Sequence, residues 1–268
     1  MAVCISCPLA PLIDDSGKYV LEVKTVSVAP SGTVLSLLRN RVNTGFVDRA
    51  YLGVAPWAES RNAKPWTLRA ISSDTNTPGL PPLPASRDEV ESIAALLPRP
   101  STVLIGAEAT KKKFEGLPLG EYRVLHLALH GAVDPVFPDK SALVFPPSKG
   151  DDGHLQAKDI RQLHLNAELV TLSACDTAVG PVGTAGIESL DRAFIEAGAN
   201  SVVSSRWALE DSSTDTFMKT FYKHLNHENK GDALRDAKLD LLHAGAAPYY
   251  WAAYDLVGDP IGAPFAKE

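Results

Sequence analysis

Two residues that can form a nucleophile and base pair each follow an apolar stretch of this chain. Cys175 comes after LVTLSA and His130 after YRVLHLAL, 45 residues earlier. A thiol is a weak nucleophile until a neighbouring base favours the thiolate, and an imidazole is the usual base. A histidine that precedes the cysteine by about 50 residues is also the arrangement of one class of cysteine protease. The pair predicts a cysteine peptidase with Cys175 as nucleophile and His130 as base.

Acyl transfer through a thiolate also needs donors for the oxyanion. Gly131 directly follows His130, and a residue without Cβ lets its backbone approach a substrate closely. We expect the Gly131 and Cys175 amides to form the oxyanion hole. The glycines Gly180, Gly183 and Gly186 would let the chain turn freely beyond the cysteine.

A third apolar stretch, SVVSSR, leads into Trp207, Glu210 and Asp211. In open α/β sheets, functional residues collect beyond the carboxyl ends of the strands. If the three stretches are neighbouring strands, a cysteine, a histidine and two acids meet in one crevice.

The elements that must position these residues alternate between strand and helix. Such alternation predicts an α/β fold, a three-layer sandwich with a mostly parallel central sheet and helices on both faces. The expected strands are 49–54, 102–105, 122–129, 142–145, 169–173, 201–206 and one within WAAYDLVGD. The expected helices are 31–42, 86–97, 109–115, 157–163, 212–225 and 232–243, together with one through Ile187 and Phe194 that stops at Gly198.

We expect one domain over residues 1–268, with a looser N-terminal part (1–84) and a catalytic core (85–268). Residues 18–28 are rich in Val, Leu and Tyr and predict one or two strands. Residues 55–84 include PGLPPLP and predict a long loop, since proline removes a donor and fixes φ. Ser86 and Glu89 have the spacing of a capping box for the next helix.

Composition indicates a globular protein, with 45% hydrophobic and 22% charged residues. A net charge of -6 without a basic stripe argues against direct nucleic-acid binding. The first residues lack a basic region and contain Pro8 and Pro11, so neither a secretory signal nor a membrane span is expected. Three cysteines suit a reducing compartment, and we expect a cytoplasmic protein.

The blocks VLHLALHG, SALVF, LVTLSACDTAVG, GIESLDRAFIEAGANSVVSSRW and PYYWAAYDLVGDP resemble the CHAT domain family of caspase-like and separase-like bacterial peptidases. Weaker similarity reaches back to VAPSGTVLSLL, so it covers nearly the whole chain. The resemblance implies a thiol protease, a hydrolase with His130 and Cys175 as its dyad and Gly131 at the oxyanion hole. It also suggests a role in bacterial defence or regulated cell death, with a partner protein as the substrate.

In the related separases an acid lies four residues after a tryptophan, which resembles Asp211 after Trp207. The resemblance therefore suggests Asp211 as a substrate-binding residue for a basic P1 side chain, with Asp176 as a second candidate. The alternative is that Asp211 caps the helix that starts at Ser212.

Two features depart from the family's pattern. The chain has no tetratricopeptide array, so a sensor or regulatory partner protein is expected elsewhere. SAC stands where caspases have QAC, so aspartate specificity is not implied. Two alternatives to a peptidase remain: a catalytically silent scaffold or peptide-binding module, and an acyl transferase or thioesterase that uses the same dyad.

Other polar residues are discounted, and we expect neither a metal nor a cofactor. Cys4 and Cys7 form a CxxC without a second ligand pair at metal-site spacing. His224 and His227 lie three apart, but without an evident carboxylate partner they are interpreted as surface side chains. His126 shares the strand parity of His130 and is a candidate to orient it. The connecting-segment residues Asp159 and Asn166 are further candidate orienters.

Overall fold

The computed structural model describes residues 9–41, 47–58, 80–134, 136–173 and 184–265, without the side chains of residues 184–188. The helices that follow the expected pattern are α2 (Gly32–Arg39), α3 (Ala85–Leu96), α4 (Lys111–Glu115), α5 (Ala157–Ile160), α6 (Thr184–Ala197), α7 (Asp211–Leu225) and α8 (Lys230–His243). The short helices α1 (Val20–Val23) and α9 (Pro248–Trp251) were not expected.

A six-stranded sheet forms the centre of the molecule. Its order is β2 (Ser101–Ile105), β1 (Arg49–Ala55), β3 (Tyr122–Leu127), β7 (Leu169–Leu172), β8 (Ser201–Ser205) and β9 (Tyr254–Gly258). All neighbouring pairs are parallel except β8 and β9. The inner strands are buried on both faces, which explains their continuous apolar sequences.

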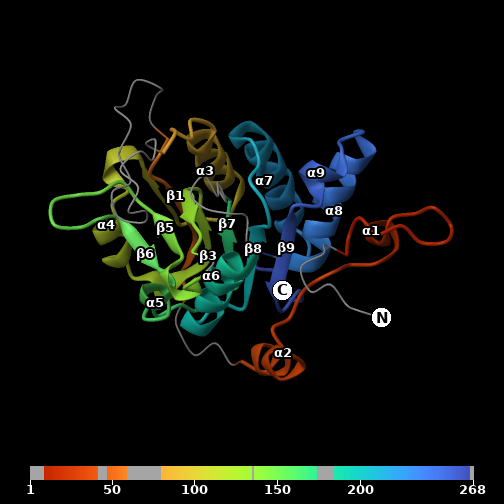
Figure 1. The fold of residues 1–268 in the computed structure, drawn as a ribbon, viewed down its shortest axis with the longest axis horizontal. Coiled ribbons are helices and arrows are strands. Elements are labelled where there is room, and N and C mark those ends of the chain that lie inside the picture. The colour runs from red at the N-terminus through yellow and green to blue at the C-terminus, as the bar shows by residue number, and fades with distance from the viewer. Residues whose placement is uncertain (1–8, 42–46, 59–79, 135, 174–183, 266–268) are drawn as a thin grey trace.

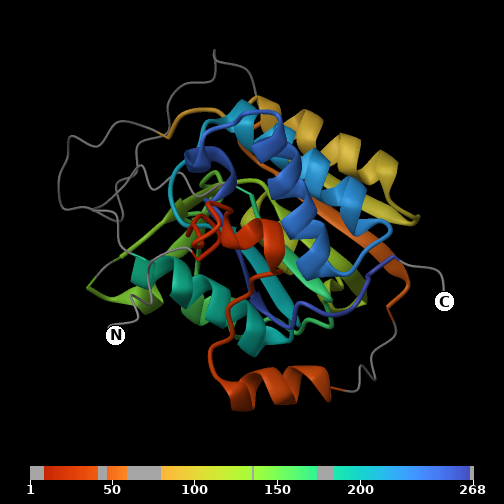
Figure 2. The same cartoon turned by 90° about the vertical axis from the view of Figure 1, so that its right-hand side faces the viewer.

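Helices cover both faces of this sheet. Successive strand residues alternate between two cores: Val124 and Leu169 pack with α3, α7 and α8, whereas Leu125 and Val170 pack with α4, α5 and α6. In Figure 2 the helices α3, α7 and α8 lie on one side of the sheet and the teal helix α6 on the other. The three-layer α/β sandwich expected from the sequence is confirmed.

A second, antiparallel sheet follows β3 in the chain (Figure 1). It consists of β4 (His130–Ala132), β5 (Ala142–Val144) and β6 (His154–Gln156), in that order. The expected strand 122–129 therefore ends at Leu127, and His130 begins a strand of the small sheet instead.

The turn after α6 follows the sequence pattern closely. Gly198 has a φ of +122°, and a Cβ at this position would lie 2.0 Å from the carbonyl oxygen of Leu165. A residue with a side chain would be strained here, so glycine ends the helix as expected.

The N-terminal segment differs from its prediction. The strand expected within residues 18–28 is wrong, because α1 forms there and buries Leu21 against Trp251 of α9. The division into a looser part (1–84) and a core (85–268) stays a prediction, and β1 of the first part is an inner strand of the central sheet.

No helix in the described ranges has both the length and the apolar composition that crossing a bilayer requires.

Candidate active site

Three neighbouring strands, β3, β7 and β8, point their carboxyl ends to one edge of the sheet. Leu127 of β3 pairs with Leu172 of β7, which in turn pairs with Ser204 of β8. The amide of Ser173 extends this pairing by donating to the Leu127 carbonyl oxygen at 3.1 Å. The adjacency on which the sequence argument depended is therefore present.

His130 lies at this edge with its ring fully buried. Its Nε2 lies 2.7 Å from the carbonyl oxygen of Pro81, and its ring packs edge-on against Trp57 with centroids 5.3 Å apart. A carbonyl oxygen only accepts hydrogen bonds, so Nε2 carries the proton. In the neutral ring, Nδ1 is then the basic nitrogen.

Cys175 and Asp176, expected as nucleophile and substrate-binding residue, lie outside the described residues, as do Gly180 and Gly183. The chain is described up to Ser173, two residues before the cysteine. Gly131 lies in β4, opposite Leu143 of β5. The roles of these residues stay predictions.

A pocket of about 230 Å³ opens at the same edge. Pro81, whose carbonyl oxygen contacts His130, lines it together with Ser173. The charged residues among those that line the pocket are all acidic, namely Glu89, Glu210 and Asp211. Pro81 therefore links the candidate base to a pocket at the end of β7, and the charged residues that line this pocket are acidic.

Asp211 is the first residue of α7 and does not cap that helix. The N-cap is Glu210, whose side chain makes no capping hydrogen bond. The Asp211 Oδ2 instead accepts the Ala85 amide at the start of α3, at 2.7 Å. Burial, with the nearby charges of Glu89 and Asp215, raises the pKa of Asp211, although the Ala85 hydrogen bond opposes this. The self-capping alternative is wrong, and the substrate-binding role stays a prediction.

Glu89 is not part of a capping box. Ser86 bonds to the Leu83 carbonyl oxygen, and the N-cap position is Pro84. The Glu89 side chain is 1% exposed and its Oε1 lies 2.6 Å from His126 Nε2. The same oxygen accepts a hydrogen bond from the Ser173 hydroxyl. Glu89 is turned into the sheet because it lies on the face of α3 that also buries Val90 and Ile93.

His126 belongs to this buried network and does not orient His130. Its Nδ1 lies 3.1 Å from the Tyr222 hydroxyl, which is 2.9 Å from Thr171 Oγ1. Both ring nitrogens of His126 are thus engaged by α3 and α7. The parity argument fails because β3 ends between the two histidines.

The other candidate orienters also lie in local structure. Asp159 accepts the Gln156 amide at the start of α5, and Asn166 donates to the Gly120 carbonyl oxygen. Trp207 stacks on Tyr249 and donates to its carbonyl oxygen.

Sequence reasoning missed two residues of the site. Pro81 acts through its backbone oxygen, for which a side-chain pattern gives no signal. For Glu89 the sequence did contain a signal, because an acid within the apolar stripe of a helix faces the core and needs a partner there.

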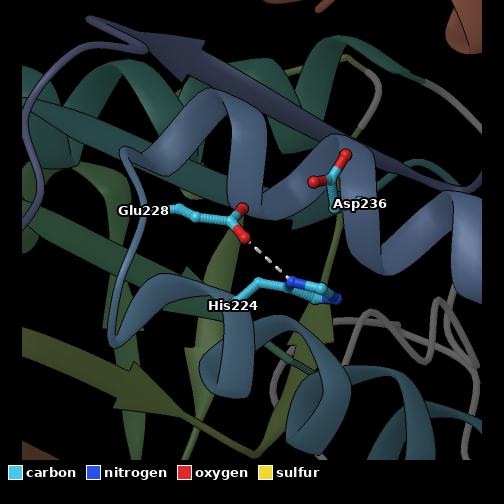
Figure 3. A group of neighbouring side chains, drawn as sticks. All are labelled: His224, Glu228 and Asp236. Carbon is cyan, nitrogen blue, oxygen red and sulfur yellow. Dashed lines mark hydrogen bonds and ion pairs between the residues drawn. The ribbon is translucent and has the colours of Figure 1, made fainter.

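His224 does have carboxylate neighbours, contrary to the expectation. Figure 3 shows it facing Glu228 and Asp236, and these three side chains offer ligand atoms within 4.8 Å of one another. Burial alone would lower the pKa of His224, but hydrogen bonds to Asp240 and Glu228 outweigh it and raise the pKa. A protonated ring between carboxylates competes with metal binding, and His227 is exposed and outside the group.

Solved structures define the class of this fold. The Saccharomyces cerevisiae separase–securin complex aligns with a TM-score of 0.52 and 13% identity over 88% of this chain and 14% of that chain. The Arg-specific cysteine proteinase gingipain R aligns with a TM-score of 0.50 and 13% identity over 85% of this chain and 52% of that chain. The protein has a caspase-like α/β fold.

The chain belongs to the CHAT domain family, whose model matches residues 5–259. Tetratricopeptide repeat protein 28 of Mus musculus is 26% identical over 67% of this chain, and its Homo sapiens counterpart is 25% identical over the same share. The chain spans 9% of the length of each of these relatives.

Proposed function

We propose that the protein is a cysteine endopeptidase that cleaves a partner protein, with a His130 and Cys175 dyad. The observation that carries the proposal is the placement of His130. Its ring is buried at the carboxyl end of β3, fixed by the Pro81 carbonyl oxygen, beside a pocket that Ser173 also lines. A base that is held in one orientation next to the strand leading to a cysteine suits thiol activation.

In this mechanism His130 Nδ1 takes the Cys175 proton, and the thiolate attacks the peptide carbonyl carbon. The Gly131 and Cys175 amides stabilise the oxyanion. The imidazolium then protonates the leaving amine, and water, deprotonated by His130, hydrolyses the acyl-enzyme. The Pro81 carbonyl oxygen accepts a hydrogen bond from Nε2–H throughout and stabilises the charged ring.

The substrate preference that we propose is a basic P1 residue. The pocket that Pro81 lines has acids as its charged lining residues, and Asp211 is among them. Asp176 is the second acid proposed from the sequence. The family suggests a role in bacterial defence or regulated cell death, under the control of a separate sensor protein, and composition suggests that this role is cytoplasmic.

The test is labelling with an arginyl chloromethyl ketone, followed by intact-mass and peptide mass spectrometry. We expect one adduct on Cys175, absent from Cys175→Ala and slowed about 100-fold or more in His130→Ala, since a general base contributes at least that factor. Cys4→Ser and Cys7→Ser serve as controls and should label like the wild type. Adduct formation that does not depend on His130 would disprove the dyad.

A silent scaffold is the second candidate, because the curated relatives are named for tetratricopeptide repeats and not for an activity. It predicts that Cys175 stays unlabelled by arginyl, leucyl and aspartyl probes alike, with and without partner proteins encoded beside it. Peptidase activity predicts labelling by at least one of them.

A further inference from the structure

The buried carboxylate of Glu89 has no role in the dyad, yet it lines the pocket beside it. Burying an ionised carboxylate is costly unless it is paired. His126 and Ser173 both bond to Oε1. Within the described part of the chain, no donor reaches Oε2, so this oxygen is available to a ligand in the pocket.

The network behind Glu89 holds this carboxylate in place. Burial raises the pKa of Tyr222, so its phenol stays protonated and can donate to His126 Nδ1. In the tautomer of His126 in which Nδ1 accepts this bond, Nε2 donates to Glu89 Oε1. The Thr171 hydroxyl, which bonds to the Tyr222 hydroxyl, is the last member of this hydrogen-bond network. The pocket thus contains a carboxylate that this network holds in one orientation.

Asp211, on helix α7, resembles Glu89 in having one carboxylate oxygen bonded and the other open. Its Oδ2 is anchored by the Ala85 amide, and no described donor reaches its Oδ1. Glu89 is among the charges that raise the pKa of Asp211, so the two acids interact across the pocket. Two carboxylates that repel each other would both be stabilised by one cation bound between them.

We propose that Glu89 is the specificity-determining residue of this pocket and that, together with Asp211, it selects a guanidinium side chain. The proposal rests on the proposed peptidase function, for which it names arginine as the P1 residue. His126 is the positioning residue, since its Nε2 bonds to Oε1 of Glu89, and Glu89 lines the pocket.

Guanidinium fits this pair better than ammonium does. Its planar fork presents five donors, enough to donate to one oxygen from α3 and one from α7 at the same time. An ammonium group is a compact, strongly hydrated charge and keeps more of its water. Arginine should therefore bind more tightly than lysine.

The test measures binding apart from catalysis. Agmatine, which is arginine without its carboxyl group, is titrated into the full Cys175→Ala chain by calorimetry, with 1,5-diaminopentane, which is lysine without its carboxyl group, as the analogue of lysine. We expect agmatine to bind more tightly than the diamine. Glu89→Gln should weaken agmatine binding by about 30-fold or more, because one partner of a buried charge pair is removed.

The matched control is Glu91→Gln on the same helix. Glu91 is exposed and pairs with Arg87 outside the pocket, so this change should leave agmatine affinity within about 2-fold of the parent. Gln at position 89 can still accept from His126 and Ser173, which favours folding of that variant. A crystal structure of Cys175→Ala with agmatine gives the same answer without any change at position 89, through the distance from the guanidinium to Glu89 Oε2.

The outcomes separate this proposal from the proposed function. Agmatine affinity that is equal in Glu89→Gln, or absent altogether, overturns the role of Glu89 even if Cys175 is labelled. Binding that depends on Glu89 without any Cys175 labelling supports the pocket and overturns the peptidase. A guanidinium bound elsewhere in the crystal structure overturns the proposal.

Discussion

Lys238 is a fully buried lysine on α8, away from the candidate site. Its Nζ donates to the Tyr254 carbonyl oxygen at 2.5 Å, and Asp255 and Arg206 are the charges nearest to it. Burial lowers its pKa to about 8 from 10.5, while the Asp255 charge opposes that shift. The folded state therefore disfavours the protonated amine.

The pH dependence of stability follows from this shift. Below pH 8 the Lys238 amine is charged in both the folded and the unfolded state, so the folded state bears the full cost of burying the charge. As the pH rises from 8 toward 10.5 the folded state holds a neutral amine and the unfolded state still holds a charged one, so this cost disappears and stability increases. Relative to Lys238→Met, the wild type should gain about 2 kcal/mol between pH 7.5 and pH 10. Urea denaturation at both pH values measures this gain.

The control for this prediction is Lys223→Met, which changes an exposed lysine on α7. Its stability difference from the wild type should stay constant over the same range. If the Lys238→Met difference is also constant, Lys238 is not neutral in the folded protein at high pH.

For single residues, the sequence pointed to side chains whose type suggests chemistry, such as histidine and cysteine. It missed side chains such as Glu89, whose role depends on which residues surround them in the fold. His130 was chosen because it follows an apolar stretch and precedes a glycine, and its catalytic role stays a prediction. Glu89 was interpreted as a cap because Ser86 stands three residues before it. The interpretation was wrong because a spacing of three residues occurs both in a capping box and along the buried face of a helix. Only the contact with His126 of β3 shows that Glu89 lies on the buried face.

Between elements, one contact joins the starts of α3 and α7. Pro84, the N-cap of α3, makes no side-chain capping bond, and Asp211 of α7 supplies the acceptor for the Ala85 amide. This bond satisfies a donor that the helix itself leaves open. It also frames the acidic pocket, because both helices line it.

Asp211→Ala should cost about 1 kcal/mol of stability, because an N-terminal acceptor of α3 is lost. Asp211→Asn keeps an acceptor oxygen and removes repulsion from Glu89, so it should stay within about 0.5 kcal/mol of the wild type. Urea denaturation at pH 7 measures both, and amide exchange at Ala85 should speed up in the alanine variant alone. Equal losses in the two variants would show that charge, and not capping, is what Asp211 contributes.

Elements with long apolar patterns were predicted well and short ones were not. Helix α7 (Asp211–Leu225) begins one residue before the expected 212–225, and β1 and β8 match their expected ranges to within a residue. Strands β4 and β6 have three residues each, too few to show a period. Helix α1 forms where β-branched residues favoured a strand, because Leu21 is buried in tertiary contacts.

Across the whole molecule, the N-terminal segment lies along the C-terminal half of the chain. Arg235 of α8 donates to the carbonyl oxygens of Leu21 and Glu22, and Thr25 donates to Asp232. Val28 pairs with Val257 and covers part of the outer strand β9. These partners are more than 200 residues apart, so no local pattern could predict the contact.

Leu21 anchors this long-range packing, and its replacement tests whether the segment is an integral part of the fold. Its side chain is 1% exposed and packs with Trp251 and Ala252. Leu21→Ala should lower the free energy of unfolding by about 3 kcal/mol, as expected when a buried leucine leaves a cavity. Val23→Ala is the matched control in the same turn, since Val23 is 48% exposed and should cost no more than about 0.5 kcal/mol.

Hydrogen exchange then distinguishes global from local effects in these two variants. If the segment folds as one unit with the core, Leu21→Ala should speed exchange in α8 and β9 as well as in α1, by the same loss of free energy. Faster exchange confined to α1, with unchanged urea denaturation, would mean that the segment opens independently of the sheet. In that case the looser N-terminal part expected from the sequence would be supported, and the contacts of Arg235 would contribute little to the stability of the core.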